Sequence, residues 1–228
     1  MNKVHLIDNM EFMKTIPDKY YELAIVDPPY GIKLQGQNII KNKNDIKNFN
    51  TDWDAEIPSE KYFIEIQRIS KSQIIWGGNY FLDYLGYCKA PIIWDKLNGK
   101  SIYADGEMAW TGGNVPRNLK IFRHQWCGAF KDSERGVVNI HPTQKPVALY
   151  KWLLQNYAHK GDKIFDSHVG SGSSRIACYD LGFDFEGCEI DKDYWQAQEE
   201  RFKTHIQQQS LFTPQELEPQ IYKQESLF

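Results

Sequence analysis

The tetrapeptide DPPY at residues 27–30 is the part of this sequence whose residue types and order most directly imply chemistry. It follows the apolar run AIV, which is typical of the end of a buried strand. The Asp27 carboxylate and the Pro28 carbonyl can both accept hydrogen bonds, since proline loses its amide donor but keeps its carbonyl. Two neighbouring acceptors suit an NH₂ group, and the Tyr30 ring can stack on a planar ring. The tetrapeptide therefore predicts a site for an exocyclic amine on an aromatic base.

A second candidate site lies in IFDSHVGSGSS, residues 164–174. A predicted strand ends at Asp166, a turn with Gly170 and Gly172 follows, and a helix begins. Glycines allow close approach of a ligand to the backbone, and a helix N-terminus favours negative groups. Glu189 ends the next predicted strand, where a carboxylate can bond ribose hydroxyls. The spacing differs from G-x-G-x-x-G, so a dinucleotide is not the obvious ligand, and a tight turn without any ligand is the alternative.

A third candidate is HPTQKPVALY, residues 141–150. Pro142 and Pro146 restrict the approach to a predicted helix. Between them, Thr143, Gln144 and Lys145 offer donors to an anion such as the carboxylate of a small cofactor. Taken alone, however, this run is better explained as the solvated start of a helix.

Strand-like and helix-like patterns alternate along the chain. Apolar runs predict strands at residues 4–8, 22–27, 73–78, 91–95, 162–166 and 183–191. Helical patterns follow at residues 11–20, where Pro17 stops a short helix, at residues 59–70 and 146–158, and from the last strand to about residue 207. Residues 170–182 read as a turn that leads into a helix. The alternation predicts an α/β fold with a doubly wound, mostly parallel sheet.

We expect one domain over residues 1–206. Residues 31–54 are rich in Asn and Lys and lack any periodic pattern, which predicts a mobile active-site loop, since loops of this length are usually functional or mobile. Residues 112–139 are predicted to be irregular, and residues 114–139 carry several basic side chains. Residues 207–228 form a polar, Gln-rich tail in which Gln-x-Ser-Leu-Phe occurs twice, at residues 208–212 and 224–228.

Composition narrows the class of protein. The net charge of −3 excludes a basic surface averaged over the chain, so any nucleic-acid patch must be local. The four cysteines show no Cys-x-x-Cys spacing, and we expect no metal. The N-terminus lacks a signal-peptide pattern, and no apolar run approaches the ~20 residues of a membrane span. We therefore expect a cytoplasmic protein without membrane attachment.

The order DPPY, HPTQKP and then a GxG turn resembles the S-adenosylmethionine-dependent amino-methyltransferases of DNA, the adenine-N6 and cytosine-N4 group. A catalytic motif that precedes the cofactor motif is similar to the circularly permuted subclass, and the compact length resembles phage and prophage enzymes. The resemblance covers residues 3–206. It implies a Rossmann-like methyltransferase fold and a site-specific DNA methyltransferase of the restriction-modification type. Because family members with an acid in the first motif position mostly act on adenine, it implies an adenine-N6 target.

The resemblance also implies a role for each matching residue. Asp27 and the Pro28 carbonyl would hold the target amine of an extruded base, and Tyr30 would stack on that base. The implied catalytic residues are Asp27, Pro28, Pro29 and Tyr30. The implied binding residues for S-adenosylmethionine are Asp8, Asp27, Thr143, Lys145, Asp166, His168, Gly170, Ser171, Gly172 and Glu189. His168 stands where the family usually has Phe, and we expect it to pack against the cofactor rather than to act in catalysis.

The implied partner is double-stranded DNA, from which the base must be flipped because its amine is not reachable within the stack. The expected nucleic-acid contacts are Tyr30, Lys33, Arg117, Lys120 and Arg123. The resemblance implies that residues 114–139 are a target-recognition insertion, and because this insertion is short we also expect a homodimer. The tail repeat resembles the peptide with which bacterial replication proteins bind the sliding clamp. The alternatives to adenine-N6 methylation are a DNA cytosine-N4 enzyme, an RNA adenine methyltransferase and a catalytically idle nucleic-acid-binding module on the same fold.

Overall fold

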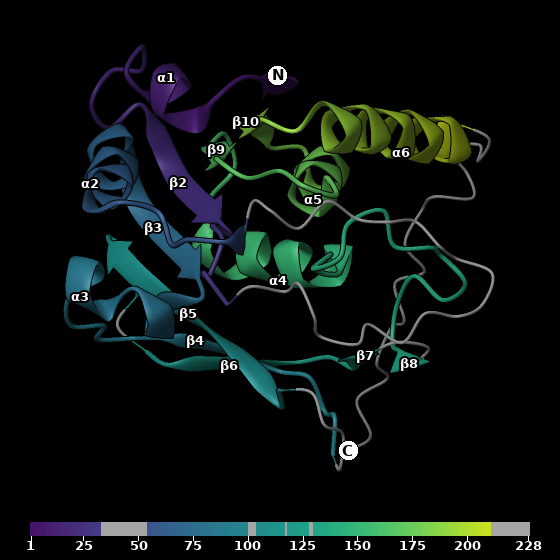
Figure 1. Cartoon of the computed structure of the whole chain (residues 1–228). Helices are drawn as coiled ribbons and strands as arrows, with labels where there is room; N and C mark the ends of the chain where they lie inside the picture. Colours follow the sequence, from purple (N-terminus) through teal and green to yellow (C-terminus); the bar gives the residue numbers. More distant parts are fainter. Residues whose placement is uncertain (33–53, 100–103, 117, 128–129, 211–228) are drawn as a thin grey trace, which may run out of the picture.

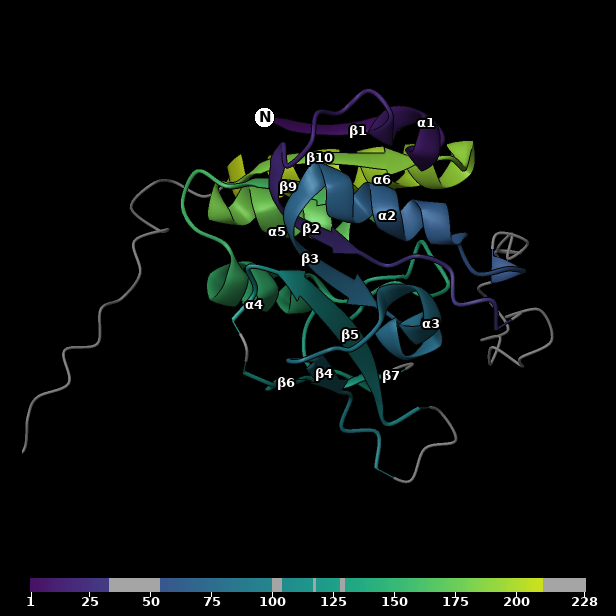
Figure 2. The ribbon, with the colours of Figure 1, turned by 90° about the vertical axis from the view of Figure 1, so that its left-hand side faces the viewer.

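The computed structural model describes residues 1–32, 54–99, 104–116, 118–127 and 130–210. A mixed eight-stranded sheet with the order β1-β10-β9-β2-β3-β5-β4-β6 forms its centre, and helices lie on both faces (Figure 1, Figure 2). The strands of this sheet are β1 (Asn2–Leu6), β2 (Tyr21–Val26), β3 (Ser70–Trp76), β4 (Ile92–Asp95), β5 (Gly106–Gly113), β6 (Lys120–Arg123), β9 (Lys163–Asp166) and β10 (Asp184–Glu189). A separate two-stranded pair consists of β7 (Trp126–Cys127) and β8 (Phe130–Lys131).

The helices fall into two groups that cover opposite faces of the sheet. One face carries α1 (Asn9–Met13), α2 (Glu60–Ile69), the short 3₁₀ helix η2 (Gly78–Tyr80) and α3 (Leu82–Leu85). The other face carries α4 (Val147–Tyr157), α5 (Ser173–Leu181) and α6 (Lys192–Ser210). This arrangement confirms the predicted α/β fold with a doubly wound, mostly parallel sheet. The last helix extends to Ser210, so the first residues of the predicted tail are helical.

Strand direction decides which residues meet at one edge of the sheet. β1, β10, β9, β2 and β3 pair in parallel, whereas β5 is antiparallel to both β3 and β4. The carboxyl ends of the parallel strands therefore share one edge, and the reversed β5 brings its first residues to that same edge.

The prediction of irregular structure over residues 112–139 is wrong for much of this region, because it contains the end of β5 and all of β6, β7 and β8. The sequence analysis also did not predict β5. Its central residues, Ala109 to Thr111, are all buried, so β5 lacks the alternation of apolar and polar residues that marks a half-exposed strand.

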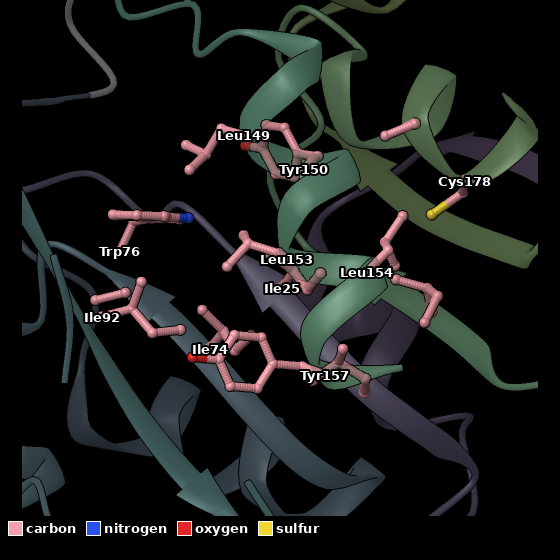
Figure 3. Packing of buried hydrophobic residues seen from close by; sticks show 14 of the residues in the cluster. Ile25, Ile74, Trp76, Ile92, Leu149, Tyr150, Leu153, Leu154, Tyr157 and Cys178 are labelled. Atoms are coloured by element: carbon pink, nitrogen blue, oxygen red, sulfur yellow. The ribbon is translucent and has the colours of Figure 1, made fainter. Parts of the chain in front are cut away.

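The helix α4 is anchored by leucines on the face that it turns toward the sheet. Leu149, Leu153 and Leu154 are fully buried. They lie against side chains of β2 and β3, among them Ile25 and Ile74 (Figure 3). Burial of each leucine contributes about 1.5–3 kcal/mol. This packing fixes the N-terminus of α4, and with it the HPTQKP run that precedes the helix.

The turn after β9 is held by hydrogen bonds to both N-terminal helices of the first face. The Asn9 amide nitrogen lies 3.0 Å from His168 Nε2, and Ser167 Oγ lies 2.9 Å from His168 Nδ1. The Tyr62 hydroxyl lies 2.7 Å from Ser167 Oγ. An amide N–H can donate only to an unprotonated ring nitrogen, so this arrangement requires neutral histidine. Burial accordingly lowers the pKa of His168 to about 4.

Acid should destabilise the protein through His168. In the unfolded chain the imidazole has a pKa of about 6.5, whereas in the folded protein its pKa is about 4. Between these two pH values the folded state binds fewer protons than the unfolded state. The free energy of unfolding therefore falls as pH falls. Between pH 7 and pH 5 the loss amounts to about 2 kcal/mol. Phenylalanine cannot be protonated. Between pH 7 and pH 5 we therefore expect the free energy of unfolding of His168→Phe to fall by about 2 kcal/mol less than that of the unchanged protein, as measured by urea unfolding followed by tryptophan fluorescence.

The control for this prediction is His159→Gln, because the His159 side chain is 92% exposed. This variant should show the pH dependence of the unchanged protein. If His168→Phe were as acid-sensitive as the unchanged protein, the neutral buried imidazole would not be the cause.

Candidate active site

Residues from all three sequence motifs meet around one cavity of about 260 Å³ at the carboxyl edge of the sheet. This is close to the ~300 Å³ lower limit of typical small-molecule sites. The walls come from the segments that follow β1, β2, β9 and β10 and from the HPTQKP run. The predicted site residues that line the cavity are Asp8, Asp27, Pro29, Thr143, Lys145, His168, Gly170, Ser171 and Glu189.

Glu189 is held in a defined orientation at the end of β10. Its Oε2 accepts a hydrogen bond from Gly170 N at 2.9 Å, and its Oε1 accepts one from Asp191 N at 3.0 Å. Burial raises the pKa of this carboxyl. Each oxygen keeps a further lone pair, so the side chain can still accept two hydroxyl groups from a ligand in the cavity.

The turn after β9 approaches the cavity with its backbone. Gly170 (φ +51°) and Gly172 (φ +76°) both adopt the left-handed conformation that favours glycine. The turn leads directly into α5, whose first N–H groups have no partner within the helix. Asp8 lies across from this turn, where it caps α1 by accepting a hydrogen bond from Glu11 N.

Two predicted cofactor residues do not line the cavity. Asp166 is buried beneath the turn, where its carboxylate accepts hydrogen bonds from Ser174 Oγ (2.6 Å) and His168 N (3.0 Å). Burial raises the pKa of Asp166 to about 7. Gly172 precedes α5 and lies against Gln198 of α6. Both residues shape the turn from behind in this structure, and their contact with the cofactor stays a prediction.

A buried group of charges closes the other end of the cavity. The Lys145 ammonium lies 2.6 Å from Asp27 Oδ2 and 3.0 Å from Glu107 Oε2. The Tyr30 hydroxyl donates to Asp27 Oδ1 at 2.6 Å and accepts a hydrogen bond from Lys145 Nζ at 3.2 Å. Lys96 Nζ lies 2.5 Å from the second Glu107 oxygen. We call these five residues the charged junction.

Burial and pairing set the protonation states in the charged junction. The Lys145 side chain is only 4% exposed, which lowers its pKa, but Asp27 and Glu107 outweigh this effect and raise it. Burial alone would raise the pKa of Glu107, yet Lys145 and Lys96 lower it to about 2. The pKa of Asp27 is raised, chiefly by burial and in part by the negative charge of Glu107. Lys145 is therefore a charged lysine shared by two carboxyl groups.

Tyr30, a member of the charged junction, is tightly packed. Its backbone N–H donates to Asp54 Oδ1, and its ring stacks on Tyr80 at a centroid distance of 5.2 Å. Gly77 has φ +71°, and a Cβ there would lie 2.2 Å from the Tyr30 ring, so only glycine fits. Neither Tyr30 nor the buried Pro28 lines the cavity, and the stacking of Tyr30 on a base stays a prediction.

Several cavity residues were not predicted from the sequence. His141 and Asp191 lie beside predicted residues in the chain, so proximity to a motif was the available signal. Glu107 belongs to the charged junction but does not line the cavity, and no local motif surrounds it in the sequence. The other unpredicted lining residues are Ile7, Asn9, Tyr150, Ser167, Val169, Ile190 and Tyr194. Gln144, which the sequence offered as a donor to an anion, also lines the cavity.

The predicted nucleic-acid contacts are described only in part. Lys33, Arg117, most of the 31–54 loop and residues 211–228 of the tail lie outside the described residues. Lys120 and Arg123 lie on β6. The Arg123 side chain is exposed, 3.5 Å from Asp95 Oδ2. No helix in the described ranges is long and apolar enough to cross a membrane.

Comparisons with known proteins agree with this arrangement. A sequence model of the N6/N4 DNA methylase family matches residues 75–200, more than half of the chain. The chain is 23% identical over 246 residues to the type II methyltransferase M.HinfI of Haemophilus influenzae, covering 89% of this chain and 68% of that protein.

Two solved structures share the fold. The M1.HpyAVI complex with SAM has a TM-score of 0.59 and 23% identity, covering 88% of this chain and 98% of the other. The cytosine-N4-specific PvuII DNA methyltransferase has a TM-score of 0.57 and 12% identity, covering 91% and 92%. These matches confirm the expected methyltransferase fold, and the family match extends over β4 to α6. The chain therefore belongs to the N6/N4 family of DNA methylases.

Proposed function

We propose that the protein is a site-specific DNA adenine-N6 methyltransferase that uses S-adenosylmethionine. The observation that carries the proposal is the place of Asp27, which lines the cavity and belongs to the charged junction. Its carboxylate has the acceptor chemistry that an exocyclic amine needs and lies beside a small-molecule pocket, with its two oxygens bonded to Tyr30 and Lys145 in this structure. The acid in the first position of DPPY favours adenine over cytosine, in keeping with the resemblance described above.

The cavity residues suit S-adenosylmethionine. Glu189 has two lone pairs free for the ribose hydroxyls, and Gly170 and Ser171 allow close approach at the turn before α5. Lys145 of the charged junction and Thr143 also line the cavity and would contact the amino-acid end of the cofactor. When bound, the cofactor supplies an electrophilic methyl group on a sulfonium.

The protein's part in the reaction is to position the amine. An adenine amine is a poor nucleophile because its lone pair is delocalised into the ring. Hydrogen bonds from its two N–H groups to Asp27 and to the Pro28 carbonyl would favour a pyramidal nitrogen with its lone pair directed at the methyl group. Positive charge then develops on that nitrogen, and the Asp27 carboxylate stabilises it. Asp27 can next accept the surplus proton, since burial raises its pKa.

The proposed substrate is double-stranded DNA with the target base flipped out. Lys120 and Arg123 on β6 are proposed contacts to the phosphate backbone, along with Lys33 and Arg117. A homodimer and a sliding clamp bound by the tail repeat are further proposed partners. The permuted motif order and the phage-type origin likewise remain predictions.

The identity of the modified base is the first test. Purified protein is incubated with S-adenosylmethionine and, in parallel samples, with mixed DNA or with RNA, and the digested nucleosides are analysed by mass spectrometry. We expect N6-methyladenine. N4-methylcytosine would contradict the adenine assignment, methylation of RNA alone would contradict the DNA substrate, and no methylated base would support an idle module.

The second test separates the two ends of the site. We expect Asp27→Ala to lower kcat about a hundred- to thousandfold while cofactor affinity, measured by calorimetry, stays within about twofold. Glu189→Gln should instead raise the cofactor Kd about ten- to hundredfold, because it replaces one charged acceptor. Each variant is the control for the other. An active Asp27→Ala enzyme would refute the role of that carboxylate.

A further inference from the structure

Glu107 is a partly buried carboxylate, with its side chain 20% exposed, that the proposed mechanism has not used. It lies opposite Trp94 in the register of β4 and β5, where the reversed β5 reaches the carboxyl edge of the sheet. One oxygen faces Lys145 Nζ at 3.0 Å and the Tyr30 hydroxyl at 3.3 Å. The other oxygen faces Lys96 Nζ at 2.5 Å. Glu107 thus contacts the same two groups that contact Asp27.

Both oxygens of Asp27 are already engaged in this structure. Oδ1 accepts from the Tyr30 hydroxyl and Oδ2 accepts from the Lys145 ammonium. A carboxylate neutralised by an ammonium is a weaker acceptor for an amine than a free one. The ammonium also opposes the positive charge that develops on the attacking nitrogen. Methyl transfer therefore needs the bond between Lys145 and Asp27 to weaken, and a buried lysine can leave one carboxylate only for another.

We propose that Glu107 is a positioning residue for methyl transfer. Its carboxylate holds the Lys145 ammonium while the target amine forms a hydrogen bond to Asp27. The inference rests on the proposed function and adds a residue to it. Lys145 already contacts both carboxylates, so a small movement of its side chain suffices. Lys96 holds Glu107 from the other side and keeps it in place when Lys145 shifts.

The charge count in the junction shows why the proposal requires a carboxylate at this position. Asp27 and Glu107 carry two negative charges, and Lys145 and Lys96 carry two positive charges, so the junction is neutral. Removal of the Glu107 charge leaves one net positive charge beside the amine. That charge both strengthens the hold of Lys145 on Asp27 and opposes the transition state.

The test compares two substitutions that separate charge from shape. Glu107→Gln keeps the size of the side chain and removes its charge, whereas Glu107→Asp keeps the charge and shortens the side chain. We expect Glu107→Gln to lower kcat about ten- to hundredfold and Glu107→Asp to lower it less than about fivefold. The cofactor Kd should stay unchanged in both. A purely structural role predicts the opposite order, with the shorter Asp more damaging than the isosteric Gln.

A pH profile gives a second readout that loss of packing would not move. The Glu107 charge contributes to the raised pKa of Asp27. In Glu107→Gln the pKa of Asp27 should therefore fall, and the acidic limb of the profile of kcat against pH should shift to lower pH. An unshifted limb in a folded Glu107→Gln enzyme, or wild-type kcat, would overturn the proposal.

Glu186→Gln is the matched control. The Glu186 side chain is 12% exposed and accepts a hydrogen bond from the Tyr21 hydroxyl, away from the charged junction. It should leave kcat and the pH profile unchanged, and thermal unfolding of all variants checks that each is folded. If the unchanged protein transferred no methyl group, the proposed function would fail and this inference with it. If the unchanged protein and Glu107→Gln were equally active, only this inference would fail.

Discussion

The buried ammonium of Lys145 is the interaction on which the site depends. A lysine that is 4% exposed stays charged only beside compensating carboxylates, and here Asp27 and Glu107 both lie within 3.0 Å of it. These three residues come from the end of β2, the start of β5 and the approach to α4. Since an unpaired buried charge costs several kcal/mol, each segment is held in place by the other two.

This constraint connects the two halves of the proposed reaction. Asp27 belongs to the motif that would receive the target amine, whereas Lys145 belongs to the run that lines the cofactor cavity. Glu189 and the turn after β9 form the far wall of the same cavity. The proposed amine acceptor and the proposed methyl-donor pocket are thus adjacent and connected through the ion pair between Asp27 and Lys145, in keeping with the close approach that an in-line transfer requires.

The sequence predicted the parts of the site that are encoded locally. DPPY, HPTQKP and the glycine turn each follow or precede a regular element, and parallel strands bring such ends together, so Asp27, Lys145 and Glu189 were found. Glu107 was not predicted. It lies on an antiparallel strand whose sequence lacks a strand pattern, and its place at the site depends on the register of that strand with its neighbours. Asp166 was expected at the cofactor by its motif; in the structure it lies beneath the turn and accepts hydrogen bonds from Ser174 and His168, an arrangement that the motif alone did not reveal.

A double-mutant cycle on Asp27→Asn and Lys145→Met tests the central claim most directly. The free energy of unfolding is measured for the unchanged protein, both single variants and the double variant. If the buried pair holds the segments together, each single variant leaves an uncompensated charge, and the double variant loses at least about 1 kcal/mol less than the sum of the singles. Additive losses, equal to that sum within about 0.3 kcal/mol, would contradict the account.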